Sequence, residues 1–167
     1  TVATKRDDWP EINPLDAPVD LSIQVSDTEG QSVYRINVEP EETLGHYSDW
    51  LRLGGVKKIL ELNGYDRAKV LSSGDALLLP VESREQQSAF EQRRTEYHRV
   101  LVEEFKENYE VTGTDLYKIQ AGDSLWVLAR EYELPIWVIT RYNPVLRSGP
   151  PRAGESIRIP RIRSRQT

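Results

Sequence analysis

An internal repeat constrains the fold of this chain more than any other feature of its sequence. The repeat is carried by matching positions in the two halves: Tyr34–Ile36 with Tyr117–Ile119, Thr43-Leu44 with Ser124-Leu125, Asn63 with Asn143, Gly74 with Gly154, and Leu77–Pro80 with Ile157–Pro160. The spacing from the asparagine to the glycine is identical in both copies, which chance rarely produces. Each copy is short enough to be a single supersecondary unit. We therefore expect two small modules in the 167 residues rather than one large domain.

Hydrophobic patterning predicts strand, helix, helix and strand in the first copy, within a module that spans residues 21–81. Apolar residues alternate with polar ones in Leu21–Val25 and again in Val33–Val38, which predicts a β-hairpin. The first of these segments lies outside the repeat, so we expect it to add a third strand to a two-stranded sheet. Two short helices are expected at 43–53 and 55–62, and a closing strand is expected at Leu77–Leu79, before Pro80.

The second copy repeats this order within a module that spans residues 112–162. Asp123 or Ser124 can cap its first helix, because a side-chain oxygen there accepts a hydrogen bond from an unpaired backbone amide. The other expected boundaries are a strand that begins at Tyr117, a first helix that ends at Arg130, a second helix from Pro135 to Asn143-Pro144, and a strand at Ile157–Ile159 that ends at Pro160.

The segments outside the two modules have distinct patterns. Residues 1–20 hold three prolines among several acidic residues, so we expect an extended leader without a core of its own. Residues 82–111 read as a long linker helix that Gly113 follows, and residues 163–167 as a basic tail. One apolar stripe follows the linker helix, at Phe90, Tyr97, Leu101, Phe105 and Tyr109.

Composition excludes several classes of function. The chain has no cysteine, which rules out disulfides and thiolate metal sites, and its two histidines lie far apart in the sequence. A net charge of −5 argues against nucleic acid as the main partner. Arginines crowd the C-terminal end, either to attract an anionic surface or simply as a solvated tail. The apolar stretches are far shorter than the ~20 residues that span a bilayer.

The second copy resembles the LysM family. Tyr117-Lys118-Ile119-Gln120-Ala121-Gly122-Asp123-Ser124-Leu125-Trp126 looks like the opening strand and Gly-Asp-Thr-Leu-Trp loop of that family, and Asn143-Pro144, Gly154-Glu155 and Ile157-x-Ile159-Pro160 complete the pattern. The first copy is a divergent match. Its loop Val38–Leu44 replaces the Gly-Asp sequence and is longer, and Asn63 is followed by Gly64 instead of proline.

The resemblance implies an α+β protein of two small βααβ modules joined by a long α-helix. It also implies non-catalytic binding of glycans that contain N-acetylglucosamine, chiefly bacterial peptidoglycan or chitin. The loop before the first helix and the loop after the second helix would form a shallow groove in each module. The groove residues would be Gly122, Asp123, Ser124, Leu125, Asn143, Pro144, Val145 and Leu146 in the second copy, and Glu41, Glu42, Thr43, Leu44, Gly64, Tyr65 and Asp66 in the first.

Each of these positions also has a purely structural interpretation. Asp123 and Ser124 fit helix caps, and Leu125 and Leu44 fit the core equally well. Asn143 fits a turn closed by side-chain bonds to the backbone. Glu41 and Glu42 resemble a catalytic carboxylate pair, but we expect a solvated loop because nothing apolar nearby would raise a pKa. For Trp126 we expect local packing, and no catalytic residue, metal site or cofactor is expected.

Two functions follow from these observations. The first is glycan binding in the bacterial cell envelope, with the second copy carrying most of the affinity because the acids of the first copy alter its groove. The second is an envelope scaffold that binds protein partners through degenerate modules. We expect a periplasmic or envelope location, with any anchor on a segment that this chain lacks.

Trp137 and Val138 form an apolar pair where the family usually has outward-facing polar residues. The matching residues in the first copy are Lys57 and Lys58. An exposed apolar patch normally marks a contact. Either the stripe of the linker helix covers Trp137 and joins the modules rigidly, or the stripes of two chains pair in a homodimer.

Overall fold

The computed structural model describes residues 13–67 and 70–165, and the chain divides into two compact units. We call Asp20–Arg99 the first unit, and the residues up to Val19 together with those from Val100 onward the second unit. Both are mixed α and β with small antiparallel sheets, as the α+β class requires. The boundary between the units falls inside one helix, so the sequence-based division into module, linker and module does not match the compact units.

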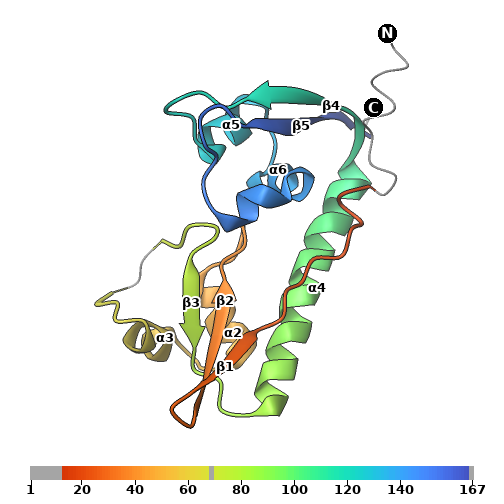
Figure 1. Ribbon diagram of the computed structural model, residues 1–167. Helices are drawn as coiled ribbons and strands as arrows, with labels where there is room; N and C mark the ends of the chain where they lie inside the picture. The colour runs from red at the N-terminus through yellow and green to blue at the C-terminus, as the bar shows by residue number, and fades with distance from the viewer. Residues whose placement is uncertain (1–12, 68–69, 166–167) are drawn as a thin grey trace. The chain divides into compact units, whose positions relative to one another are not determined.

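A three-stranded antiparallel sheet forms one side of the first unit (Figure 1). Its order is β1 (Gln24–Thr28), β2 (Gln31–Asn37) and β3 (Ala76–Leu79). Glu29 and Gly30 both have positive φ in the two-residue turn between β1 and β2, as a tight hairpin requires.

The additional strand β1 begins at Gln24, later than the expected Leu21. The backbone groups just before Gln24 form hydrogen bonds with side chains of the long helix instead of with a neighbouring strand. The amide of Ile23 donates to Glu91 Oε2 at 2.7 Å, and the carbonyl of Leu21 accepts from Arg94. Leu21 and Ile23 are buried, whereas every residue of β1 is exposed.

Two short helices, α2 (Leu44–Leu51) and α3 (Lys57–Leu62), lie between β2 and β3 in the chain. Thr43 caps α2 in a reciprocal arrangement, in which its hydroxyl accepts from the amide of His46 and its amide donates to the His46 ring. The core between sheet and helices is built from side chains that are almost fully buried: Ile36, Tyr47, Leu51, Ile59, Leu77, Leu79 and Phe90.

The long helix α4 (Arg84–Asn108) ends before the expected stripe does. Tyr109 already opens strand β4 (Tyr109–Lys118), so the expected stop at Gly113 and the expected strand start at Tyr117 are wrong. Gly113 lies instead at an irregularity of β4, where a Cβ would overlap the guanidinium of Arg161. A larger residue at this position would require the half-exposed side chain of Arg161 to move away from the backbone.

Strands β4 and β5 (Ser156–Ser164) form the two-stranded antiparallel sheet of the second unit. Pro160 does not end β5, since it pairs with Thr114 and the strand continues to Ser164. Proline is tolerated because a strand with one neighbour leaves alternate amides without a ladder partner. Arg163, expected in a free basic tail, therefore belongs to β5 and forms an ion pair with Glu110.

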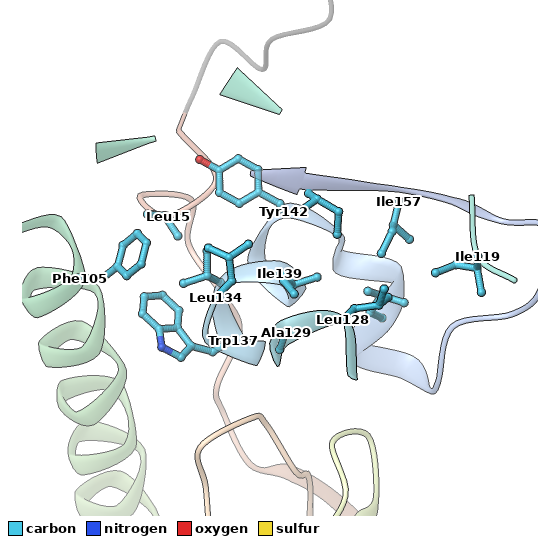
Figure 2. Close-up of a cluster of buried hydrophobic side chains, with 13 residues drawn as sticks. Leu15, Phe105, Ile119, Leu128, Ala129, Leu134, Trp137, Ile139, Tyr142 and Ile157 are labelled. Carbon is cyan, nitrogen blue, oxygen red and sulfur yellow. The ribbon is translucent and has the colours of Figure 1, made fainter. Parts of the chain in front are cut away.

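Helix α6 (Ile136–Tyr142) packs against β5, and α5 (Leu125–Glu131) and the 3₁₀ turn η1 (Pro144–Ser148) pack against α6. Figure 2 shows part of their shared core, with Phe105 of α4 directed at the indole of Trp137. The two rings meet edge to face with their centroids 5.6 Å apart. Trp137 and Val138 are only 7% and 0% exposed, so the expected outer patch is absent. The helix covers Trp137 within the second unit itself.

Residues 13–19 are not a free leader, because Leu15 inserts into the core of the second unit and is 3% exposed (Figure 2). Asp16 forms an ion pair with Lys106, and the carbonyl of Ala17 accepts a long hydrogen bond from Arg141. The prolines and acidic residues of this segment are typical of an extended leader, so the burial of its one leucine was not predicted from the sequence. Residues 1–12 of the expected leader lie outside the described residues.

We expect Leu15→Ala to lower the free energy of unfolding of the second unit by about 2–4 kcal/mol, because the change leaves a cavity in a closed core. Urea denaturation of the full chain measures the loss. Asp16→Ala is the matched control, since its ion pair is about half exposed and is worth at most about 1 kcal/mol. Equal effects of the two changes would contradict the buried role of Leu15.

Candidate functional site

The loop before α5 is closed by Asp123 and capped by Ser124. Asp123 Oδ2 accepts from the amide of Gln120 at 2.8 Å and from the hydroxyl of Tyr117 at 2.7 Å. Ser124 Oγ accepts from the amide of Val127 at 3.2 Å, so Ser124 is the helix cap and Asp123 is not. The hydrogen bond to Asp123 is the main reason that the pKa of Tyr117 is raised to about 12. Gly122, at the tip, is exposed.

The loop after α6 has two buried and two exposed residues among its expected glycan contacts. Asn143 is 7% exposed and Leu146 is 2% exposed, so Leu146 belongs to the core and cannot be a groove contact. Pro144 is exposed, and Val145 is 63% exposed. Leu125, from the other loop, also packs partly buried against this core. The residues open to a ligand are therefore Gly122, Pro144 and Val145, with Asp123 and Ser124 half-buried beside them.

Asn143 is a clamp between α6 and β5. Its Nδ2 donates to the carbonyls of Ile139 at 2.8 Å and Arg158 at 2.7 Å, and its Oδ1 accepts from the amide of Arg158 at 2.7 Å. The side-chain bonds to backbone that the sequence suggested are thus present. They also join the helix to the strand, which the sequence did not reveal.

Asn63 makes the same three bonds in the first unit, to the carbonyls of Ile59 and Leu78 and from the amide of Leu78. The turns before the closing strands also match. Gly74 donates to the carbonyl of Val38 and Gly154 to that of Ile119, both at 2.8 Å. The two units therefore share the hydrogen bonds that hold the second helix and the closing strand in place.

The matching loop of the first unit differs because Glu42 is buried. Its carboxylate accepts two hydrogen bonds from Arg94, one from the hydroxyl of Tyr47 and one from the amide of Glu39, and it lies 2.8 Å from Nε2 of His98. The side chain of Glu42 is 0% exposed, so the expectation of a solvated loop is wrong for Glu42, whereas Glu41 is exposed as expected. Glu42 therefore cannot contact a glycan.

The carboxylate of Glu42 stays ionised in spite of its burial. Burial by itself raises its pKa, but hydrogen bonds from His98, Arg94 and Tyr47 and the charge of Arg94 outweigh it and lower the pKa from 4.5 to about 2. Burial beside this carboxylate raises the pKa of the Tyr47 phenol. The cluster is a charge-compensated clamp that ties the loop before α2 to α4.

Arg94 and His98 are the residues that sequence reasoning missed. They lie four residues apart on α4, between Phe90 and Leu101 of the apolar stripe, so they share its buried face. A polar pair that interrupts an apolar stripe could have been read as the partner of a buried acid. The identity of that acid could not, because Glu42 lies 52 residues from Arg94 in the chain.

The other expected groove residues of the first unit divide between surface and core. Glu41 and Asp66 are exposed, Thr43 is the cap of α2, and Leu44 is 6% exposed in the core. Gly64 is exposed, and Tyr65 packs partly buried against the same core. The exposed part of this loop pair is thus acidic, in contrast to the second unit.

The C-terminal arginines are largely paired. Arg161 bonds to Asp115, and Arg163 and Arg165 form ion pairs with Glu110. Among residues 13–67 and 70–165, no group of histidine, aspartate and glutamate side chains is arranged to hold a metal ion. Within the same ranges, no helix is both long enough and apolar enough to cross a membrane.

Comparison with known families identifies one match. Residues 117–160, less than half of the chain, match the LysM domain. LysM domains generally bind glycans that contain N-acetylglucosamine, act by binding and not by catalysis, and are typically extracellular or associated with the cell envelope. A search of curated proteins found no match.

Proposed function

We propose that the second unit binds a glycan that contains N-acetylglucosamine, without catalysis, in the bacterial cell envelope or periplasm. Peptidoglycan is the polymer that we favour. The observation that carries the proposal is the LysM match at residues 117–160, which includes both loops of the candidate groove. The exposed Gly122, Pro144 and Val145 are the contacts that we assign to the ligand. Small or apolar side chains there suit backbone hydrogen bonds to an N-acetyl group and contact with its methyl.

The first unit is, in this proposal, a divergent copy that serves as a scaffold and contributes little glycan affinity. The hydrogen bonds shared by Asn63 and Asn143 support common descent of the two copies. Burial of Glu42 under Arg94 and His98 favours a structural or protein-interaction role for that loop. An envelope protein is the partner class that fits this alternative.

We expect Val145→Glu to weaken binding of chitin oligosaccharides about tenfold or more, because an apolar contact worth about 1.4 kcal/mol is replaced by a charge. Isothermal titration calorimetry on the full chain measures the affinity. The melting temperature should be unchanged, since Val145 is 63% exposed.

Leu116→Glu is the matched control, because Leu116 is 70% exposed on β4 and belongs to neither loop. Sedimentation with purified peptidoglycan sacculi, compared with chitin beads, then identifies the polymer. Unaltered affinity of the Val145 variant would contradict the groove. Binding to neither polymer by the unaltered protein would contradict the proposed function. The full chain is needed, because a fragment that begins at residue 112 would cut β4 and remove Phe105 from the core.

A further inference from the structure

A concave surface lies in the second unit, outside the loops assigned to the groove. It is a pocket of about 670 Å³ between α5, the turn to α6, the end of α4 and the β4–β5 sheet. Tyr109, Trp126, Ile136 and Ile162 supply apolar lining, and Arg130 and Glu133 supply the charged groups. A mostly apolar pocket of this size with a few polar groups is typical of a site for a small ligand.

Two aromatic side chains of this pocket are open to solvent. Trp126 is 60% exposed and Tyr109 is 38% exposed. The guanidinium carbon of Arg130 lies 4.8 Å from the centre of the indole, and the ring of Tyr109 lies 5.2 Å from that of Phe105, which packs on Trp137. Both aromatic rings are thus held by neighbours while much of their surface stays uncovered.

The fold does not require a tryptophan at this position. Trp126 is the second residue of α5 after the cap Ser124, and Gly45 is the second residue of α2 after the cap Thr43. Both helices form, although glycine is among the poorest helix residues. The helix ends match as well, since Leu53 donates to the carbonyl of Ser48 and Leu134 to that of Ala129. The requirements of folding therefore do not account for an exposed indole at position 126.

The chemistry of the lining selects one class of occupant. A hydrocarbon chain would desolvate Arg130 and Glu133 without pairing them, which costs free energy. A strongly anionic ligand would meet the carboxylate of Glu133. A sugar ring has an apolar face that suits an indole, and each hydroxyl both donates and accepts, so it can satisfy a guanidinium and a carboxylate together.

We propose that this pocket is a second saccharide subsite, in which Trp126 stacks on a pyranose ring while Arg130 and Glu133 bond to its hydroxyl groups. The proposal rests on the proposed function, because the ring belongs to the same N-acetylglucosamine-containing polymer that the groove binds. Two contacts on one polymer raise the overall affinity through effective concentration, so the subsite adds most for long oligomers.

Titration of the full chain with chitin dimers and chitin hexamers tests the subsite. Trp126→Ala should weaken hexamer binding about tenfold and dimer binding less, whereas Trp126→Phe should retain most of the affinity because a stacking surface remains. Leu116→Ala is the control, since it removes an apolar side chain that is 70% exposed and does not line the pocket. Circular dichroism checks that each variant is folded, as the exposure of the two side chains leads us to expect.

The outcomes separate the two proposals. If Trp126→Ala binds hexamers as the unaltered protein does while Val145→Glu does not bind, the subsite is wrong and the groove stands. If Trp126→Ala loses affinity while Val145→Glu keeps it, the pocket is supported and the groove assignment is wrong. Absence of binding by the unaltered protein overturns both.

Discussion

Replacing Glu42 by alanine should destabilise the first unit by about 3–5 kcal/mol, because the change leaves the guanidinium of Arg94 buried without its counter-charge. Arg94 is 2% exposed and also donates to the carbonyls of Leu21 and Asn37. Loss of the carboxylate therefore loosens the segment before β1 and the end of β2 as well as the loop before α2. Urea unfolding of the full chain, followed by hydrogen exchange in residues 20–99, measures the effect.

Lowering the pH should weaken the interaction of Glu42 with Arg94 and so destabilise the first unit without any substitution. The pKa of Glu42 is lowered in the folded protein, so its contribution is complete above pH 4.5 and is lost as the pH falls toward about 2. A shift of this size corresponds to about 3 kcal/mol. Glu42→Gln should flatten the pH dependence of the first unit in this range. Glu41→Gln is the control, since Glu41 is the exposed neighbour. An unchanged acid profile in Glu42→Gln would show that the cluster does not hold the unit together.

Replacing Asn143 by alanine should destabilise the second unit by about 2–4 kcal/mol, because two carbonyls and one amide lose their buried partner. Asn63→Ala should do the same in the first unit. Hydrogen exchange should localise each effect to the unit that carries the change.

Pro144→Ala is the adjacent control. Pro144 is exposed, so its replacement should cost at most about 1 kcal/mol, through the greater freedom of the unfolded chain. The result also decides the role of Asn143 itself. A variant of Asn143 that keeps its stability but loses glycan binding would make the asparagine a ligand contact and would contradict its role as a clamp.

The short helices of the two units could be predicted from sequence because their signals are local. Thr43 and Ser124 cap helices through bonds that span three residues, and Asn63 and Asn143 follow helix ends in the two units. The strand at Tyr109–Lys118 was harder to predict. Helical and extended patterns overlap at Tyr109, and Gly113 resembles a helix stop unless the crossing guanidinium of Arg161 is known.

Contacts between distant segments could not be predicted. Glu42 follows two other acids within four residues, a pattern typical of a solvated loop. Its burial depends on Arg94 and His98, which come from another element. The burial of Leu146 in the candidate site could not be predicted from sequence for the same reason. Its neighbour Val145 is also apolar but exposed, and only the packed core shows which of the two side chains faces inward.

The second unit is discontinuous in sequence, and this has a consequence for its synthesis. Asn13 lies 129 residues before Tyr142, whose hydroxyl bonds to it at 3.4 Å, and Leu15 reaches the same core. During synthesis, residues 13–19 are translated before the rest of the second unit, and β5 is translated after α4, β4, α5 and α6. The first unit is complete once Arg99 has emerged, so it is expected to fold early. Leu15 therefore has no core to enter until β5 has been translated, and we expect chaperone binding during that interval to concentrate at residues 13–19.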